Sequence, residues 1–112
     1  MVHTSMEGAE KAAEKGISSE VLDLRSLVPL DWEAIAESVK KTSRVVIVYE
    51  APKTGGFGGE ISARIAEELI LHLDSPILRV TGYDTPFPYT LEDLYLPNAE
   101  RVADAIERAV HF

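Results

Sequence analysis

The chain of 112 residues is long enough for one domain with a single hydrophobic core. Its composition, 46 % apolar and 27 % charged, is typical of a folded globular protein and excludes a disordered chain. No apolar run reaches the roughly 20 residues that cross a membrane, and no leader peptide is recognisable. Because cysteine is absent, disulfides and thiolate chemistry are excluded, and we expect a cytoplasmic protein.

Acidic side chains outnumber basic ones by 19 to 11, for a formal net charge of −8. Nucleic-acid-binding proteins concentrate Lys and Arg on one face, so this balance predicts no nucleic-acid partner. The acidic residues are spread along the chain, which is typical of a solvated surface. We expect any charged protein partner to be basic.

Helical and strand-like patterns alternate from the start of the chain. Thr4 and Glu7 form a capping-box pattern, which predicts a short helix that ends at Gly16. Residues 17–24 follow with the apolar pattern of a strand. Residues 29–30, Pro-Leu, predict a turn.

The middle of the chain predicts a buried strand between two helices. Asp31 is expected to cap a helix that runs to about Lys40. Residues 44–49 contain four consecutive apolar residues, which is typical of a parallel strand buried on both faces. A glycine-rich turn over 54–59 then leads into a helix over 60–73.

A third strand is predicted over 77–81, followed by a proline-rich loop over 83–97 and a last helix capped by Asn98. Alternating helices and strands predict an α/β fold, a three-layer α/β/α sandwich with a mostly parallel sheet. Doubly wound folds open with a strand, whereas this pattern opens with a helix. We therefore expect one domain, residues 1–112, that lacks its first strands.

The glycine-rich turn lies between a strand and a helix, where α/β proteins often cradle phosphates. The dinucleotide-binding pattern fails, because Ile61 occupies the position of its third glycine. Glu60 at the start of the helix would repel a phosphate. A structural turn is therefore favoured over a phosphate site. The residues of this turn are Gly55, Gly56, Gly58, Gly59 and Glu60.

Glu50 lies at the C-terminal end of the central strand, where open α/β sheets place ligands. We expect its carboxylate to accept hydrogen bonds from the amides of the glycine loop, rather than to act as a base. The histidines, His3, His72 and His111, share no metal-ligand spacing, which argues against a metal site. His72 ends an apolar helix face and is expected to be partly buried.

Residues 83–89 combine two prolines with three aromatic side chains. Aromatic residues offer a large contact area at low entropic cost, and exposed aromatics rimmed by polar groups mark interfaces. Two interpretations are equally favoured: the loop packs over its own sheet edge, or it contacts another domain or subunit. On the second interpretation, the candidate contact residues are Tyr83, Asp84, Phe87, Tyr89 and the C-terminal Phe112.

The stretches D-L-R-S-L-V-P-L-D over 23–31 and E-A-P-K-T-G-G-F-G-G-E-I over 50–61 resemble the transketolase C-terminal domain family. Two further stretches, G-Y-D-T-P-F-P over 82–88 and Y-L-P over 95–97, are similar to the β subunits of pyruvate and branched-chain 2-oxoacid dehydrogenase E1 components, more than to transketolase itself. The resemblance covers essentially the whole chain. In the family, an edge strand and a central strand precede the first helix, in agreement with the expected lack of first strands.

The resemblance implies a role in assembly. In these enzymes α and β subunits form a heterotetramer that decarboxylates a 2-oxoacid and acylates the lipoyl group of E2. Thiamine diphosphate and magnesium lie between the α subunit and the N-terminal domain of β, so this chain is expected to bind no cofactor and to be inactive alone. The implied partners are the E1 α and β subunits and the small, basic peripheral subunit-binding domain of E2, in an oligomer without nucleic acid or membrane.

Two alternatives remain open at the level of sequence. One is a free-standing α/β module that binds a nucleotide or phosphorylated metabolite through the glycine loop and Glu50. The other is a truncated gene product without a function.

Overall fold

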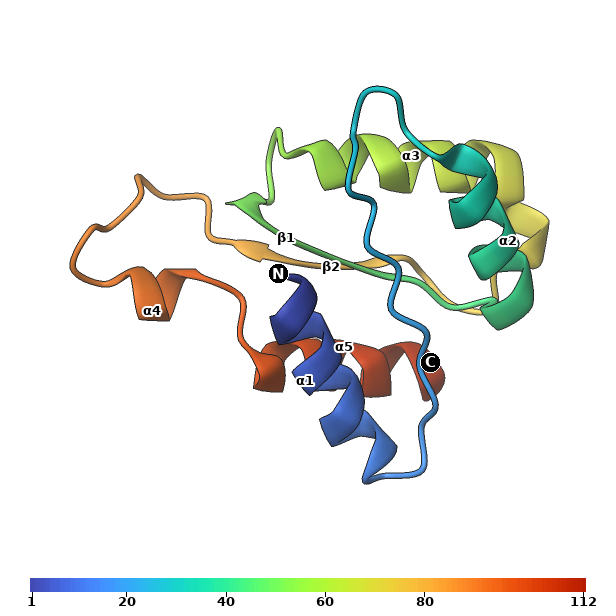
Figure 1. Ribbon diagram of the computed structural model, residues 1–112, viewed down its shortest axis with the longest axis horizontal. Helices are drawn as coiled ribbons and strands as arrows, with labels where there is room; N and C mark the ends of the chain where they lie inside the picture. Colours follow the sequence, from blue (N-terminus) through green and yellow to red (C-terminus); the bar gives the residue numbers. More distant parts are fainter.

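The computed structural model describes all 112 residues and forms a two-stranded parallel sheet covered by helices. In chain order the elements are α1 (Val2–Ala13), α2 (Trp32–Thr42), β1 (Val46–Pro52), α3 (Phe57–Leu69), the 3₁₀ turn η1 (Ile70–His72), β2 (Leu78–Gly82), α4 (Glu92–Tyr95) and α5 (Ala99–Val110). Helices α2 and α3 cover one face of the sheet, and α5 with α1 covers the other (Figure 1). The predicted three-layer α/β/α architecture is confirmed.

The strand region 45–48 contributes to the core on both faces of the sheet. Val45 and Ile47 pack against the apolar cluster of α2 and α3, whereas Val46 and Val48 pack against the cluster that includes α5. Side chains alternate between the two faces of a strand, so one apolar run can serve two helix layers. The best-buried large side chain is Ile65 of α3, at 1 % exposure.

Both strands end at the same edge of the sheet. The parallel register pairs Val46 with Leu78 and Val48 with Val80, and an irregularity precedes the pairing of Pro52 with Gly82. Because the strands are parallel, the loops that follow them meet at this carboxyl edge.

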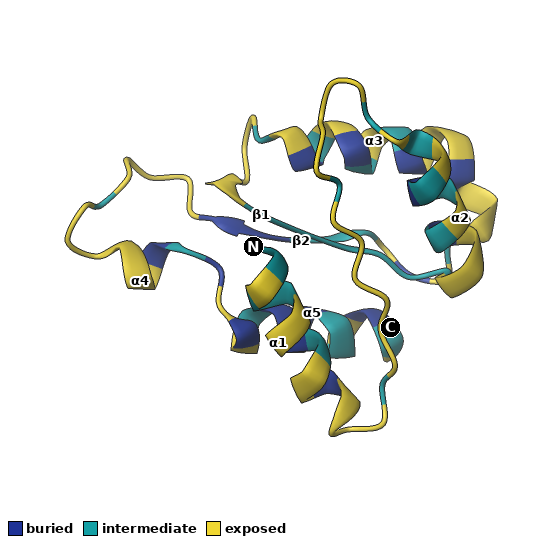
Figure 2. Ribbon diagram, in the orientation of Figure 1, coloured by how far each residue is buried: buried dark blue, intermediate teal, exposed yellow.

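The strand predicted over residues 17–24 is absent. These residues form an extended and largely exposed segment, here called the strap, which passes in front of β1 (Figures 1 and 2). No main-chain hydrogen bond joins the strap to β1. The prediction was wrong because a strand needs a paired neighbour as well as an apolar pattern. Residues 45–48 are accordingly half-buried and not buried on both faces as predicted.

The first helix begins earlier than its capping-box pattern predicts. Helix α1 starts at Val2, and the Ser5 N–H donates to the Met1 carbonyl at 2.9 Å, so Thr4 and Glu7 lie inside the helix. No side chain caps this end.

The two other predicted caps are confirmed. Asp31 Oδ1 accepts a hydrogen bond from the Ala34 N–H at 3.2 Å at the start of α2. Asn98 Oδ1 accepts one from the Arg101 N–H at 2.9 Å at the start of α5. A cap satisfies one of the backbone donors that the first turn of a helix leaves free.

Helix α3 begins at Phe57 and ends at Leu69, so it is shifted toward the glycine loop relative to the predicted range of 60–73. His72 lies in the 3₁₀ turn that follows and is exposed, which corrects the predicted partial burial. None of the helices is both long and apolar enough to cross a membrane.

Candidate interaction site at the carboxyl edge of the sheet

Asp84 ties together the loops that follow the two strands. Its carboxylate accepts hydrogen bonds from the Thr54 hydroxyl at 2.5 Å and from the Thr54 main-chain N–H at 2.9 Å. The bond from the hydroxyl, followed by that from the N–H, holds the pKa of the Asp84 carboxyl below its ordinary value. We call this pair of hydrogen bonds the Asp84 clasp.

Residues 83–95 form an aromatic arm that extends away from the helices and sheet (Figure 1). Tyr95 anchors it, at 5 % exposure. The rings of Phe87 and Tyr83 lie edge-on to Tyr95, at 5.2 and 6.4 Å between centroids, and Tyr89 lies edge-on to Phe87 at 5.9 Å. Edge-to-face aromatic pairs each contribute about 0.5–1.5 kcal/mol beyond area burial, so the arm is held by its own rings.

Gly82, the last residue of β2, lets the Tyr95 ring and the Glu50 carbonyl lie close to the main chain where the arm leaves the sheet. A Cβ at this position would lie 2.6 Å from a ring carbon of Tyr95 and would clash with the Glu50 carbonyl oxygen. A side chain here would therefore displace the anchoring tyrosine from the end of β2.

Arg101 fastens the base of the arm to α5. Its Nη2 donates to the Thr81 carbonyl at 2.7 Å, and its guanidinium lies 4.9 Å from the centre of the Tyr83 ring. Its Nη1 is buried and has no hydrogen-bond partner. The cation–π contact and the hydrogen bond orient Tyr83 at the edge of the sheet.

The arm presents apolar side chains to solvent. Tyr83, Phe87 and Tyr89 are 51 %, 46 % and 88 % exposed. Leu91 and Leu94, at 56 % and 72 % exposed, extend the same surface and were not predicted. The sequence signal for them was weak, because isolated leucines after a proline-rich stretch do not follow a helical or strand period.

The exposed carboxylates of the arm, Asp84, Glu92 and Asp93, are here called its acidic rim. The arm itself contains no Lys or Arg, and the cations beside it are Lys53 near Asp84 and Arg101 against the Tyr83 ring. A basic partner would therefore meet complementary charge around an apolar centre.

Phe112 lies apart from the other predicted contact residues. It is 80 % exposed and borders a shallow depression with Ile70 and Ile77, next to the start of β2. The arm follows the end of β2, at the opposite side of the molecule (Figure 1). The structure thus brings together Tyr83, Asp84, Phe87 and Tyr89, but not Phe112.

The glycine loop is shaped by the Tyr49 side chain beneath it. A Cβ at Gly56 or Gly58 would overlap the Tyr49 ring. Arg79 supports the ring and the loop, since its Nη1 donates to the Tyr49 hydroxyl at 3.3 Å and to the Lys53 carbonyl at 3.0 Å. Packing against the Tyr49 ring therefore explains why glycine occupies these positions, and no bound ligand is needed to explain it. This favours the predicted structural turn.

Glu50 does not perform the predicted role in that loop. Its carboxylate is exposed and makes no hydrogen bond to the loop amides. At the end of β1 the chain turns away, and the loop is tied to Asp84 and Arg79 instead.

The chain offers no site that fits a metal-bound diphosphate. No three or more His, Asp or Glu side chains lie close enough together to hold a metal ion. Glu60 in the first turn of α3 adds negative charge where a phosphate would approach that helix. We therefore derive no step of a reaction through a cofactor bound to this chain.

Comparison with known proteins agrees with the fold. The sequence pattern of the family "Transketolase, C-terminal domain" matches residues 1–102. The chain belongs to this family. This transketolase C-terminal domain is 51 % identical over 106 residues to "2-oxoisovalerate dehydrogenase subunit beta, mitochondrial" of Dictyostelium discoideum. It is also 45 % identical over 113 residues to "Pyruvate dehydrogenase E1 component subunit beta" of Leifsonia xyli.

The transketolase C-terminal domain spans about a third of the length of these relatives. The matches cover 94 % and 100 % of the chain but 29 % and 34 % of the two proteins. A solved structure, "Split gene transketolase, inactive beta4 tetramer", superposes with a TM-score of 0.81 at 29 % identity, over 98 % of this chain and 35 % of its own. The arrangement of helices and strands is therefore one that a known transketolase shares.

Proposed function

We propose that this transketolase C-terminal domain is part of the β subunit of a thiamine-diphosphate-dependent 2-oxoacid dehydrogenase E1 component, and that it serves assembly and docking. The acid-rimmed aromatic arm carries the proposal, because its rings are ordered by contacts with one another and yet Tyr83, Phe87 and Tyr89 stay exposed to solvent. The relatives' names support the class of enzyme, since they are β subunits that act on pyruvate or branched-chain 2-oxoacids.

The physical character of the arm suits a protein partner. Tyr83, Phe87 and Tyr89 are pre-ordered by ring contacts, so binding would lose little side-chain entropy. Tyr is among the residues enriched at binding hot spots. The acidic rim and the formal charge of −8 favour a basic partner, such as the peripheral subunit-binding domain of E2.

The whole enzyme would supply what this chain lacks. Thiamine diphosphate and magnesium would be held by the E1 α subunit and by another part of the β subunit, and the native state would be an oligomer of α and β subunits. A cytoplasmic location also stays a proposal, and two of the relatives carry "mitochondrial" in their names. The chain alone should not decarboxylate pyruvate or 2-oxoisovalerate in the presence of thiamine diphosphate and magnesium.

Docking is tested by titrating the chain with a purified E2 peripheral subunit-binding domain in a calorimeter. Tyr89→Ala should weaken binding at least tenfold, because truncation of a central aromatic contact costs about 2 kcal/mol or more. Val28→Ala is the matched control, since Val28 is 89 % exposed and lies outside the arm.

Salt provides a second readout of the same contact. Raising the ionic strength should weaken binding of the wild-type chain, because it screens the acidic rim. Equal binding by Tyr89→Ala and Val28→Ala would remove the arm from the proposal, and no binding by the wild-type chain would remove docking altogether.

A further inference from the structure

The Asp84 clasp links the aromatic arm to the glycine loop. Thr54 supplies both donors of the clasp, its main-chain N–H at 2.9 Å and its hydroxyl at 2.5 Å, and they reach different oxygens of the Asp84 carboxylate. Thr54 lies in the loop after β1, and Asp84 lies just beyond the end of β2. The clasp therefore joins two loops 30 residues apart in the sequence, at the place where the arm leaves the sheet.

Beyond Asp84 the arm makes its hydrogen bonds within itself. The Leu91 N–H, for example, donates to the Pro88 carbonyl at 2.9 Å. The aromatic rings likewise contact one another. Such internal contacts give the arm a shape, whereas its direction relative to the sheet depends on the contacts of its base. These include two polar contacts, the Arg101 guanidinium over the Tyr83 ring and the Asp84 clasp.

The clasp also divides the work of the acidic rim. Both oxygens of the Asp84 carboxylate are engaged by Thr54, and Lys53 is the nearby cation. Glu92 and Asp93 are exposed and form no ion pair within the chain. Charge complementarity with a basic partner therefore depends on Glu92 and Asp93. Asp84 has a structural task instead, because its hydrogen bonds are already made before a partner binds.

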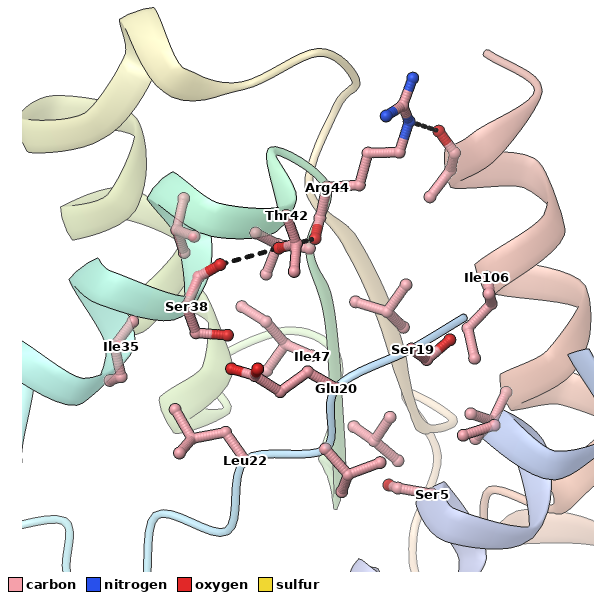
Figure 3. Close-up of a pocket in the computed structure, with 18 of the residues that line it drawn as sticks. Ser5, Ser19, Glu20, Leu22, Ile35, Ser38, Thr42, Arg44, Ile47 and Ile106 are labelled. Carbon is pink, nitrogen blue, oxygen red and sulfur yellow. Dashed lines mark hydrogen bonds between the residues drawn. The ribbon is translucent and has the colours of Figure 1, made fainter. Parts of the chain in front are cut away.

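The strap is fastened by different contacts and does not share the clasp. It crosses a hollow of about 360 Å³ beside β1, between α2 and α5 (Figure 3). Glu20 of the strap forms an ion pair with Lys41 near the end of α2. No residue of the arm or of the clasp lines this hollow, so a change at the clasp should leave the strap unaffected.

We propose that the Asp84 clasp holds the aromatic arm in the orientation that its protein partner binds, and that Thr54 is a positioning residue for docking. This inference rests on the proposed function, since it assigns the clasp to the same surface. When only a fraction of the molecules present the competent surface, the apparent affinity falls by that fraction. Thr54 belongs to the glycine loop, so its effect on docking passes through Asp84.

The first measurement needs no partner. Amide relaxation, followed by nuclear magnetic resonance, reports the order parameter of each backbone N–H. Thr54→Val removes the hydroxyl donor, and Asp84→Ala breaks the clasp from the other side. Both should lower the order parameters of Phe87 and Tyr89 toward the flexible range below about 0.6, without a change in the strap. Thr54→Ser keeps the donor and should restore order. Thr85→Val is the matched control, because the hydroxyl of this exposed threonine makes no hydrogen bond.

The second measurement follows the rates of binding to a purified E2 peripheral subunit-binding domain. Thr54→Val should slow association about fivefold and leave dissociation unchanged, because it lowers the fraction of competent arms. Tyr89→Ala, which removes a contact, should act mainly on dissociation. The salt dependence of association should be unchanged in Thr54→Val and smaller in Glu92→Gln. Thr85→Val should bind within twofold of the wild type.

The two measurements separate the ways in which the proposal fails. Unchanged order parameters in both Thr54→Val and Asp84→Ala would show that the clasp does not hold the arm. A more mobile arm that associates at the wild-type rate would show that docking does not depend on its orientation, and an effect of Thr54→Val on dissociation alone would make Thr54 a contact residue. No binding by a wild-type chain whose arm is ordered would overturn the proposed function, and the clasp would then be a structural tie only.

Discussion

Gly58 is a residue whose identity is set by one neighbour. It lies in the first turn of α3, where alanine would normally stabilise a helix by about 1 kcal/mol. A Cβ at this position would overlap the ring of Tyr49, so Gly58→Ala should instead destabilise the chain by about 1–3 kcal/mol. Urea unfolding measures the difference.

The adjacent glycine is the control for that prediction. A Cβ at Gly59 would lie 3.3 Å from Arg79 Nη1, the end of a flexible side chain, so Gly59→Ala should change stability by less than about 1 kcal/mol. If Gly58→Ala in a Tyr49→Leu background is as costly as in the wild type, the ring is not the cause.

The Asp84 clasp predicts a pH dependence with a definite sign. The pKa of Asp84 is lower in the folded chain than its unfolded value of about 3.9, because the carboxylate accepts two hydrogen bonds from Thr54. Its contribution to stability is therefore present above that unfolded value and is lost as the pH falls through the folded pKa. Asp84→Asn should lower the urea midpoint at pH 7, and the gap to the wild type should narrow at pH 3.

Thr54→Val tests the cause of that pH dependence. It removes the hydroxyl donor but keeps the shape of the side chain, so its stability gap to the wild type should narrow at low pH in the same way. A gap that stays constant between pH 7 and pH 3 in both variants would contradict the clasp.

At the scale of elements, α1 is held to the domain by its packing on α5. A Cβ at Gly8 would lie 2.5 Å from Val102 Cγ1, so the two helices touch at a glycine. The Lys11 Nζ lies 3.6 Å from Glu100 Oε1. Lys15 forms an ion pair with Glu107, which raises the pKa of the Lys15 amine. Such exposed pairs contribute little, so we attribute the attachment to apolar contact.

Gly8→Ala should push α1 away from α5 and destabilise the chain by about 1–3 kcal/mol. Val102→Ala makes room for the added methyl group, so the double variant should be less destabilised than the sum of the two single variants. Urea unfolding of all four chains gives the coupling, and strictly additive costs would show that α1 is held elsewhere.

At the scale of the whole molecule, we expect one cooperative unfolding transition. The strand region 45–48 contributes side chains to both apolar clusters, so neither cluster can unfold without the other. The slope in urea should be about 1–3 kcal/mol/M for a chain of this size. Circular dichroism at increasing urea would contradict this expectation if it showed two steps or a broad, shallow loss of signal.

The radius of gyration shows that the chain is slightly extended. It is 13.8 Å, slightly above the roughly 13 Å expected for a compact chain of this length. The aromatic arm, which extends from the sheet, contributes to the added size.

Local signals in the sequence determined much of this protein. The caps at Asp31 and Asn98, the parallel strand at the apolar run and the glycine loop act over a few residues, through backbone hydrogen bonds and side-chain periodicity. Each appears in the structure, but the strand is half-buried and not buried on both faces as predicted. Their order was enough to predict the layered α/β fold, because parallel strands require crossover helices.

Only the tertiary structure decided the features that depend on distant neighbours. Residues 17–24 have a strand-like pattern, but they form a strap because no paired strand stands beside them. Leu91 and Leu94 extend the exposed apolar surface of the aromatic arm, and Phe112 lies at the opposite side of the molecule. The physical reason is that pairing, clasping and burial depend on which surfaces meet in space, and a local pattern does not contain that information.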